Sequence, residues 1–191
     1  MSISSEAVSG GKSSNELIGM AKEIVKNMFG KAGEKILDYL VSNGYIAEER
    51  IATSIDVRSS EARKILQRLS DEALVVPDRL KDVETGEILH IWRLNNTALK
   101  SFILNRLRKT REKLELLLKY ESEGSIYICR TCNRRFYIDE AYAYGFQCPH
   151  DNDVLVEANN PTTIANLKES IRKINTLISM IERMQSGGGK V

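Results

Sequence analysis

Several features that would point to an enzyme or a membrane protein are missing from this chain of 191 residues. It has only two histidines, and it shows no nucleophile–base set, no paired carboxylates and no phosphate-binding glycine loop. No apolar run approaches the roughly 18 residues of a membrane span, and the first residues lack the apolar stretch of a secretory signal. We therefore expect a cytoplasmic protein that is not an enzyme and has no membrane partner.

An excess of charge of one sign is also missing. The formal net charge is only +2, and basic and acidic residues are interleaved along most of the chain. A protein that binds DNA tightly by itself usually carries a denser basic face. We expect this chain to bind DNA weakly and mainly without sequence preference.

Cysteine is scarce, and the three cysteines all lie between residues 129 and 148. An odd, clustered set suits a metal site better than a disulfide framework. The cysteines are therefore the first candidates for a functional site.

Residues 16–96 carry the pattern of helices followed by a hairpin. Helical patterns of apolar residues lie in 16–30, 31–43 and 47–55, and again from a cap at Ser59 or Ser60 through Leu69, with Gly30 and Gly33 at the end of the first helix. Two short extended runs follow, at 74–76 and 88–94, with a turn at 84–86. Helices followed by a two-stranded hairpin are typical of a winged helix, so we predict a winged-helix domain over 16–96, behind a flexible leader at 1–15.

Two further helices are predicted, a linker helix at 97–124 and a C-terminal helix at 159–186, before a flexible tail at 187–191. Both carry apolar residues at alternating steps of three and four, the spacing of a coiled-coil seam. We expect the two to pair antiparallel and to hold residues 125–158 at the tip. Packing of each helix on a globular body, or pairing with a second protein, are the alternatives. The seam residues are Ile103, Leu107, Thr110, Leu114 and Leu117 in the first helix, and Ile164, Leu167, Ile171, Ile174, Ile178 and Ile181 in the second.

Residues 125–158 are rich in strand-forming aromatic residues but too few to bury a core of their own. A structural metal is the usual remedy, and two CxxC turns would supply four thiolates to one tetrahedral zinc ion. Here the sequence offers Cys129, Cys132 and Cys148, but Asp151 stands at the fourth position, with His150 as the alternative ligand. The other interpretation is a fold held by its aromatic core, with the cysteines reduced or in a disulfide. Zinc is the expected cofactor.

The predicted fold class is α+β: an N-terminal winged helix, an antiparallel helical linker pair and a small zinc-ribbon-like β module. Over residues 16–185 this order of parts resembles the archaeal transcription factor E alpha family, which is similar to the N-terminal half of the eukaryotic TFIIE alpha subunit. The stretches that carry the resemblance are AEERIATSIDVRSSEARKILQRLSDEALV, RLKDVETGEILHIWRL and YICRTCNRRFYIDEAYAYGFQCPHD. The family usually has four ribbon cysteines and a wing richer in aromatic residues.

The resemblance implies a basal transcription initiation factor that binds RNA polymerase at its clamp and stalk. Such a factor favours the open clamp, assists melting of promoter DNA and stabilises the open complex. The implied partners are RNA polymerase, the complex of TATA-binding protein with the promoter, and a beta subunit with an iron–sulfur cluster. The implied location is the archaeal nucleoid.

Six residues are candidates for contact with polymerase or nucleic acid: Arg79, Lys81, Trp92, Arg93, Arg134 and Arg135. Trp92 could equally be a core or strand-packing residue. Arg58, Arg63, Lys64 and Arg68 lie on or before the expected recognition helix, but acidic residues interleave with them, and a solvated helix face is the preferred interpretation. The rival function is a sequence-specific DNA-binding repressor that dimerises through its heptad helices.

Overall fold

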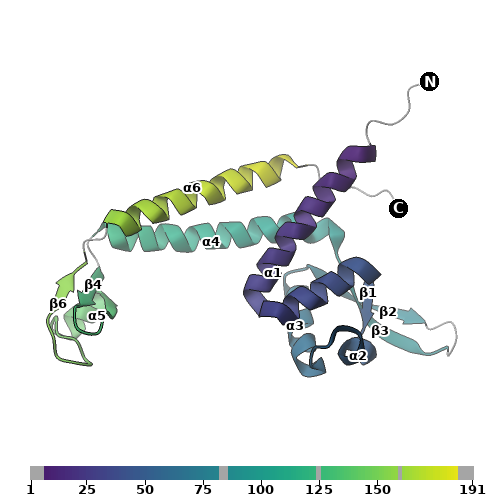
Figure 1. Ribbon diagram of the computed structural model, residues 1–191, viewed down its shortest axis with the longest axis horizontal. Helices are drawn as coiled ribbons and strands as arrows, with labels where there is room; N and C mark the ends of the chain where they lie inside the picture. The colour runs from purple at the N-terminus through teal and green to yellow at the C-terminus, as the bar shows by residue number, and fades with distance from the viewer. Residues whose placement is uncertain (1–6, 82–85, 124–125, 159–160, 185–191) are drawn as a thin grey trace, which may run out of the picture. The chain divides into compact units, whose positions relative to one another are not determined.

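The structure, a computed structural model, describes residues 7–81, 86–123, 126–158 and 161–184. It is an α+β protein with helices and two small antiparallel sheets, as predicted (Figure 1). The chain divides into two compact units, Met1–Arg106 with Ile181–Val191, and Leu107–Met180. Within the described ranges, no helix has both the length and the apolarity to cross a membrane.

The first unit begins with a long helix, α1 (Ala7–Asn43), that is kinked at Gly30. Gly30 has φ of 64° and ψ of −153°, a conformation that a residue without a Cβ adopts readily. The two predicted helices are therefore the two arms of α1. The helix starts at Ala7, inside the segment 1–15 that was predicted as a leader, and residues 1–6 lie outside the described part.

Short elements connect α1 to the next long helix. They are β1 (Tyr45–Ala47), the 3-10 turn η1 (Glu48–Arg50) and α2 (Ile51–Ile55), and they lead into α3 (Ser59–Asp71). Helix α3 agrees with the sequence pattern, whereas the helix predicted at 47–55 is α-helical only at Ile51–Ile55 and begins in a strand and a 3-10 turn. Strand β1 was not predicted, because three residues are too few to show a period of two.

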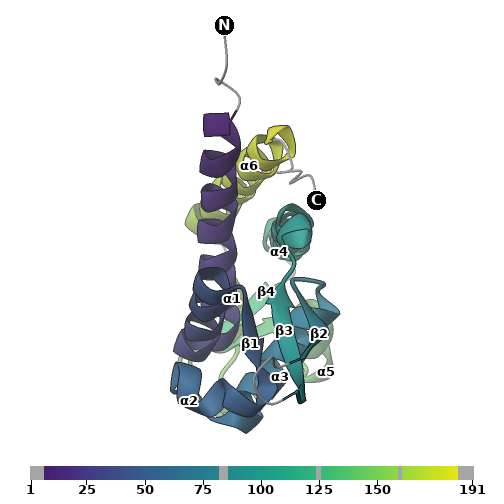
Figure 2. The ribbon, with the colours of Figure 1, turned by 90° about the vertical axis from the view of Figure 1, so that its right-hand side faces the viewer.

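The predicted hairpin consists of β2 (Val75–Lys81) and β3 (Ile88–Leu94), and β1 pairs with the other edge of β3. The strand order is β1–β3–β2 and all pairs are antiparallel (Figure 2). Pro77 lies in β2, an edge strand, where the sheet tolerates a residue without an N–H. Most of the predicted turn lies outside the described residues, which resume at Gly86.

The helices and the sheet of the first unit bury apolar side chains, and α1 and α3 contact the sheet. Fully burying one Leu, Ile or Val side chain contributes roughly 1.5–3 kcal/mol, so a core of this size holds the hairpin firmly on the helices. The buried residues include Leu17, Ala21, Val25, Ile36, Leu37, Leu40, Ile46, Ala62, Ile65, Leu66, Leu69, Val75, Ile91 and Phe102.

The second unit combines parts of two long helices with a small sheet. After the turn η2 (Asn96–Ala98), α4 (Leu99–Ser122) leads to β4 (Ile126–Cys129), and β5 (Arg135–Tyr137), α5 (Ile138–Ala143) and β6 (Leu155–Glu157) follow before α6 (Pro161–Arg183). The three strands lie in the order β5–β4–β6, all antiparallel. We refer to residues 126–158 as the cysteine module.

Helices α4 and α6 contact each other. Residues near the start of α4 contact residues at the end of α6, and residues in the middle of one helix contact the middle of the other. The Lys100 Nζ donates to the backbone oxygens of Glu182 and Met184, at 2.9 and 2.6 Å, and an Arg111 Nη donates to Asn175 Oδ1 at 3.3 Å. Early residues of α4 thus contact late residues of α6, which fits the expected antiparallel pairing.

The heptad positions face inward on α6 and only partly on α4. On α6, Leu167, Ile178 and Ile181 are buried, and the other three seam residues are half-buried. On α4, Ile103 is buried, but Thr110 is exposed, so the seam is interrupted there. The sequence pattern placed Thr110 among the seam residues of α4, and for this residue the prediction of a buried seam position was wrong.

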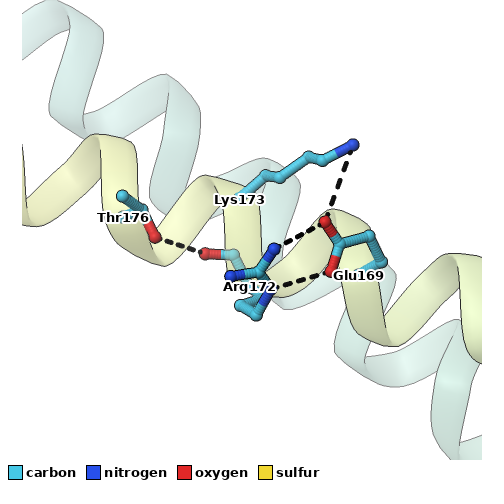
Figure 3. A network of polar contacts seen from close by, with 4 residues as sticks. All are labelled: Glu169, Arg172, Lys173 and Thr176. Atoms are coloured by element: carbon cyan, nitrogen blue, oxygen red, sulfur yellow. Dashed lines mark hydrogen bonds and ion pairs between the residues drawn. The ribbon is translucent and has the colours of Figure 1, made fainter.

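The outward face of α6 carries a polar network, drawn in Figure 3. The Arg172 guanidinium donates to both carboxylate oxygens of Glu169, at 2.7 and 2.8 Å, and Lys173 Nζ lies 3.7 Å from the same carboxylate. Thr176 Oγ1 donates to the Arg172 backbone oxygen at 3.0 Å. These are exposed contacts of the i,i+3 and i,i+4 type, which support a helix modestly.

Candidate metal centre

The first two candidate ligands lie on a tight turn after β4, which we call the first knuckle (residues 129–134). The Cys129 N–H donates to the Arg134 oxygen at 3.0 Å, and the Asn133 N–H donates to the Cys129 oxygen at 2.9 Å. Asn133 has φ of 56°, in the left-handed region that asparagine tolerates better than most residues. This turn directs the side chains of Cys129 and Cys132 to one point.

The second knuckle (residues 148–153) has the same backbone hydrogen bonds. The Cys148 N–H donates to the Asp153 oxygen at 2.8 Å, and the Asn152 N–H donates to the Cys148 oxygen at 2.9 Å. Asn152 has φ of 58°. Asp151 therefore occupies in the second knuckle the position that Cys132 occupies in the first.

The four side chains that the spacing predicted come together. One ligand atom from each of Cys129, Cys132, Cys148 and Asp151 lies within 4.8 Å of the other three. The Cys129 Sγ lies 3.3 Å from Asp151 Oδ1, and the Cys132 and Cys148 Sγ atoms lie 3.6 Å apart. Around a tetrahedral zinc ion the corresponding separations are about 3.6 and about 3.8 Å. The spacing and the donor set, three thiols and a carboxylate, fit Zn²⁺.

All three cysteines are free in the structure. The 3.6 Å between the Cys132 and Cys148 sulfurs is far longer than the roughly 2.05 Å of a disulfide bond. The alternative in which these cysteines form a disulfide therefore does not describe this structure.

Backbone amides support the ligands at equivalent places in the two knuckles. The N–H of Asp153 donates to Asp151 Oδ1 at 3.2 Å, and the N–H of Arg134 stabilises the Cys132 thiolate in the same way. In both cases the donor lies two residues after the ligand. The carboxylate of Asp151 thus receives the support that a thiolate would receive.

The ionisation of the two outer ligands differs. Asp151 is exposed, and the partial loss of its hydration opposes the charged form, but hydrogen bonds from the Cys148 thiol, the Asp153 N–H and the other thiols outweigh this and lower the pKa of the Asp151 carboxyl. At Cys132 the N–H of Arg134 favours the thiolate, whereas burial and the neighbouring ligands act against it and raise the pKa of the thiol to about 12. A metal that binds here must therefore displace protons from thiols.

His150, the alternative fourth ligand, is exposed and does not belong to the ligand cluster. Its position in the second knuckle matches that of Thr131 in the first. Thr131 Oγ1 donates to Asp153 Oδ2 at 2.7 Å, a hydrogen bond that joins the two knuckles. The sequence pattern gave no signal for this contact, because the two residues belong to different turns.

A small apolar core surrounds the ligands. Cys129 and Cys148 are buried together with Phe136, Ala141 and Leu155. The half-buried rings of Tyr127 and Phe146 pack against this cluster, with their centroids 5.0 Å apart. The aromatic residues that predicted strands thus also supply the apolar wall of the site.

The two contact candidates of the cysteine module, Arg134 and Arg135, differ in their surroundings. Arg134 is exposed, as a contact residue would be. The Arg135 guanidinium lies 2.5 Å from Glu121 Oε1, and the Glu121 side chain at the end of α4 is only 1% exposed. Arg135 therefore joins β5 to α4 within the second unit, although its side chain is 43% exposed. Glu121 was not singled out from the sequence, because a buried glutamate has no local signature.

The contact candidates on the β2–β3 hairpin separate onto two faces of the sheet. Side chains alternate along a strand, and the register pairs Arg79 with His90 and Lys81 with Ile88. Arg79, Lys81 and Trp92 therefore share one face, where both basic residues are exposed and Trp92 is half-buried. Arg93 belongs to the other face and forms an ion pair with Asp78 at 3.1 Å.

The basic residues of α3 do not form a separate positive surface. The Arg63 guanidinium contacts Glu48 at 2.7 Å, and Glu61 lies among the exposed Arg58, Lys64 and Arg68. This arrangement agrees with the solvated, nearly neutral helix face that the sequence suggested.

Comparison with known proteins places this architecture in a class of transcription factors. Residues 19–123, more than half of the chain, match the family model described as TFIIE alpha subunit. Transcription factor E of Staphylothermus marinus is 40% identical over 156 residues, which cover 81% of this chain and 98% of that protein. The transcription factor E proteins of Methanocaldococcus jannaschii and Pyrococcus abyssi are 31% and 33% identical, over 80% of this chain and 90% and 80% of their own lengths. The chain belongs to the TFIIE alpha subunit family.

Proposed function

We propose that this chain is a basal transcription initiation factor that acts by binding RNA polymerase, not by recognising a DNA sequence. The observation that carries the proposal is the match to transcription factor E proteins over about four fifths of the chain. The low net charge is a second support, because tight independent DNA binding requires a denser basic face.

In this proposal the first unit is a winged helix. Its support is a three-stranded antiparallel sheet packed beside α1, α2 and α3, with the β2–β3 hairpin as the wing. The face of the wing with Arg79, Lys81 and Trp92 contacts polymerase or the adjacent nucleic acid. Arg93 contributes less, since its guanidinium already pairs with Asp78.

The cysteine module is a zinc ribbon in which Cys129, Cys132, Cys148 and Asp151 hold one Zn²⁺. The bound ion would supply folding free energy, because a module of this size buries little apolar surface. The residues would position the ion through two knuckles of equal shape, and the apolar cluster around Phe136 would exclude water. Of the two predicted contact residues of the module, Arg134 is the one that has no ion pair among the described contacts and faces solvent, so we assign it to polymerase.

The mechanism that we propose is a shift of populations. A factor that binds the open clamp of polymerase more tightly than the closed clamp favours the open state by its difference in affinity. Loading and melting of promoter DNA follow, and the open complex is stabilised. Further expected partners are the complex of TATA-binding protein with the promoter and a beta subunit with an iron–sulfur cluster.

The experiment that tests the binding step is co-purification of tagged full-length chain with RNA polymerase. Wild-type protein is expected to retain polymerase, and the double substitution Arg79→Ala with Lys81→Ala is expected to retain less. Arg172→Ala, which removes an exposed positive charge from α6, serves as the control and should bind as wild type does. Absence of polymerase from the wild-type eluate would refute the proposal.

The rival function, a repressor that dimerises through its heptad helices, requires those helices to meet a second copy. In the structure, residues of α4 and α6 contact each other within one chain. A homodimer in light scattering, together with nanomolar binding to one palindromic DNA site, would favour the repressor over the initiation factor.

A further inference from the structure

The four ligands of the candidate centre differ in their access to solvent. Cys129 and Cys148 are fully buried, Cys132 is half-buried, and Asp151 is exposed. An incoming ligand that removes a metal ion must approach from the side that solvent reaches. In this module that side carries the carboxylate.

The carboxylate also differs from the thiolates in the bond that it can form. Zinc is a borderline-soft ion and binds thiolate sulfur strongly, whereas carboxylate oxygens are hard ligands that suit harder cations. The exposed ligand of this centre is therefore also the one with the weaker bond to zinc. In a site of four cysteines no such difference exists.

The geometry of Asp151 allows one oxygen to replace the other. Its Oδ1 and Oδ2 lie 3.3 and 3.4 Å from the Cys129 sulfur, so both oxygens lie at the edge of the cluster. Apart from the ligand thiols, whose protons a bound metal would displace, the Asp153 N–H is the donor that holds Oδ1, at 3.2 Å. Rotation of the side chain about its own bonds would open the centre and leave the three sulfurs in position.

We infer that Asp151 is the ligand through which this centre exchanges its metal, so that occupancy of the module follows the free zinc concentration. The inference rests on the proposed zinc ribbon. When the carboxylate moves away, a water molecule or a competing ligand takes the fourth position, and transfer of the ion can proceed from there. A cysteine at position 151 would bind the ion more tightly and prevent this exchange. The two knuckles have the same backbone conformation, so its thiolate could lie where the Cys132 thiolate lies in the first knuckle.

The test is the rate of zinc release from the full-length, zinc-loaded chain. The protein is kept reduced with a phosphine and mixed with excess of the chromogenic chelator 4-(2-pyridylazo)resorcinol, and the colour of the chelator–zinc complex is followed. Asp151→Cys is expected to slow release on the order of 10-fold or more, because a thiolate replaces the oxygen. Asp151→Asn, which removes the charge and keeps the shape, is expected to release zinc faster than wild type. His150→Ala is the matched control and should release zinc at the wild-type rate.

The outcomes separate this inference from the zinc ribbon itself. If wild type binds one zinc ion but releases it at the same rate as Asp151→Cys, the exchange role is refuted and the metal centre stands. Should Asp151→Cys fail to fold, the comparison of wild type with Asp151→Asn takes its place. In that case the inference is refuted when the two proteins release zinc at the same rate. If wild type binds no zinc, the proposed metal centre and the exchange role fail together.

Discussion

Asn133 and Asn152 occupy the same position in the two knuckles and share the left-handed backbone conformation, with φ of 56° and 58°. Each donates its N–H to the oxygen of the first ligand of its own turn. The second knuckle has therefore kept the backbone of a metal-binding turn although its second ligand is an aspartate. This relationship is the strongest structural support for Asp151 as the counterpart of Cys132.

Replacing Asn152 tests this conformation. Asn152→Ala should lower the free energy of unfolding of the cysteine module by about 1 kcal/mol, because a Cβ-bearing residue without a compensating polar side chain is disfavoured at positive φ. Asn152→Gly should differ from wild type by less than about 0.5 kcal/mol. Urea unfolding followed by tyrosine fluorescence measures both, and equal losses for alanine and glycine would contradict the expectation.

The ion pair between buried Glu121 and exposed Arg135 predicts an asymmetric effect. Arg135→Ala should cost about 1–3 kcal/mol, because it leaves the Glu121 carboxylate buried without its cation, and Glu121 Oε2 has no hydrogen-bond partner among the described residues. Replacing both residues with leucine should recover much of that loss. Urea unfolding of the two variants tests this, and a cost below about 0.5 kcal/mol for Arg135→Ala would mean that the pair contributes little.

The seam of α6 can be compared with the helix face beside it. Ile178→Ala should cost about 2–4 kcal/mol, because Ile178 is buried and the substitution leaves a cavity. Its neighbour Leu177 is 39% exposed, and Leu177→Ala should cost under about 1 kcal/mol. Thermal unfolding of both proteins measures the difference, and similar melting temperatures would show that the heptad face is not packed in solution.

The polar network in Figure 3 predicts a dependence on pH. The hydrogen bonds from Arg172, and then the charges of Arg172 and Lys173, lower the pKa of the Glu169 carboxyl. A carboxyl whose pKa is lower in the folded state stabilises the fold above its unfolded pKa of about 4.3, and this contribution disappears as the pH falls through the folded pKa. Wild type should therefore be more stable than Glu169→Gln at neutral pH, and the two should converge in acid. Melting temperatures measured from pH 7 to pH 3 test this, and a constant difference would contradict it.

The helices could be predicted from the sequence, because amphipathic periods are a local property. Gly30 marked the kink in α1 correctly, and the heptads of α6 face inward. Two features were missed for local reasons. Strand β1 has only three residues, too few to show alternation. Thr110 fits the three-and-four spacing of the seam, but its side chain is exposed. The helical start at Ala7 was missed because the polar, glycine-containing leader shows no apolar period.

The clustering of Cys129, Cys132, Cys148 and Asp151 could be predicted because the spacing of a knuckle determines where its side chains point. Asp151 follows from that spacing without knowledge of the fold. The ion pair between Glu121 and Arg135 and the hydrogen bond between Thr131 and Asp153 could not be predicted, since each joins residues far apart in the sequence. The separation of Arg93 from Arg79 and Lys81 could have been found from strand alternation once the register was known.

The central claim is that this chain promotes promoter opening through polymerase. The most direct measurement is open-complex formation at a weak promoter, with purified archaeal polymerase and its promoter-binding factors, followed by permanganate reactivity of unpaired thymines. Added wild-type chain is expected to increase that reactivity, and the Arg79→Ala, Lys81→Ala protein should increase it less. Unchanged reactivity over a range of wild-type concentrations that saturates polymerase binding would contradict the account.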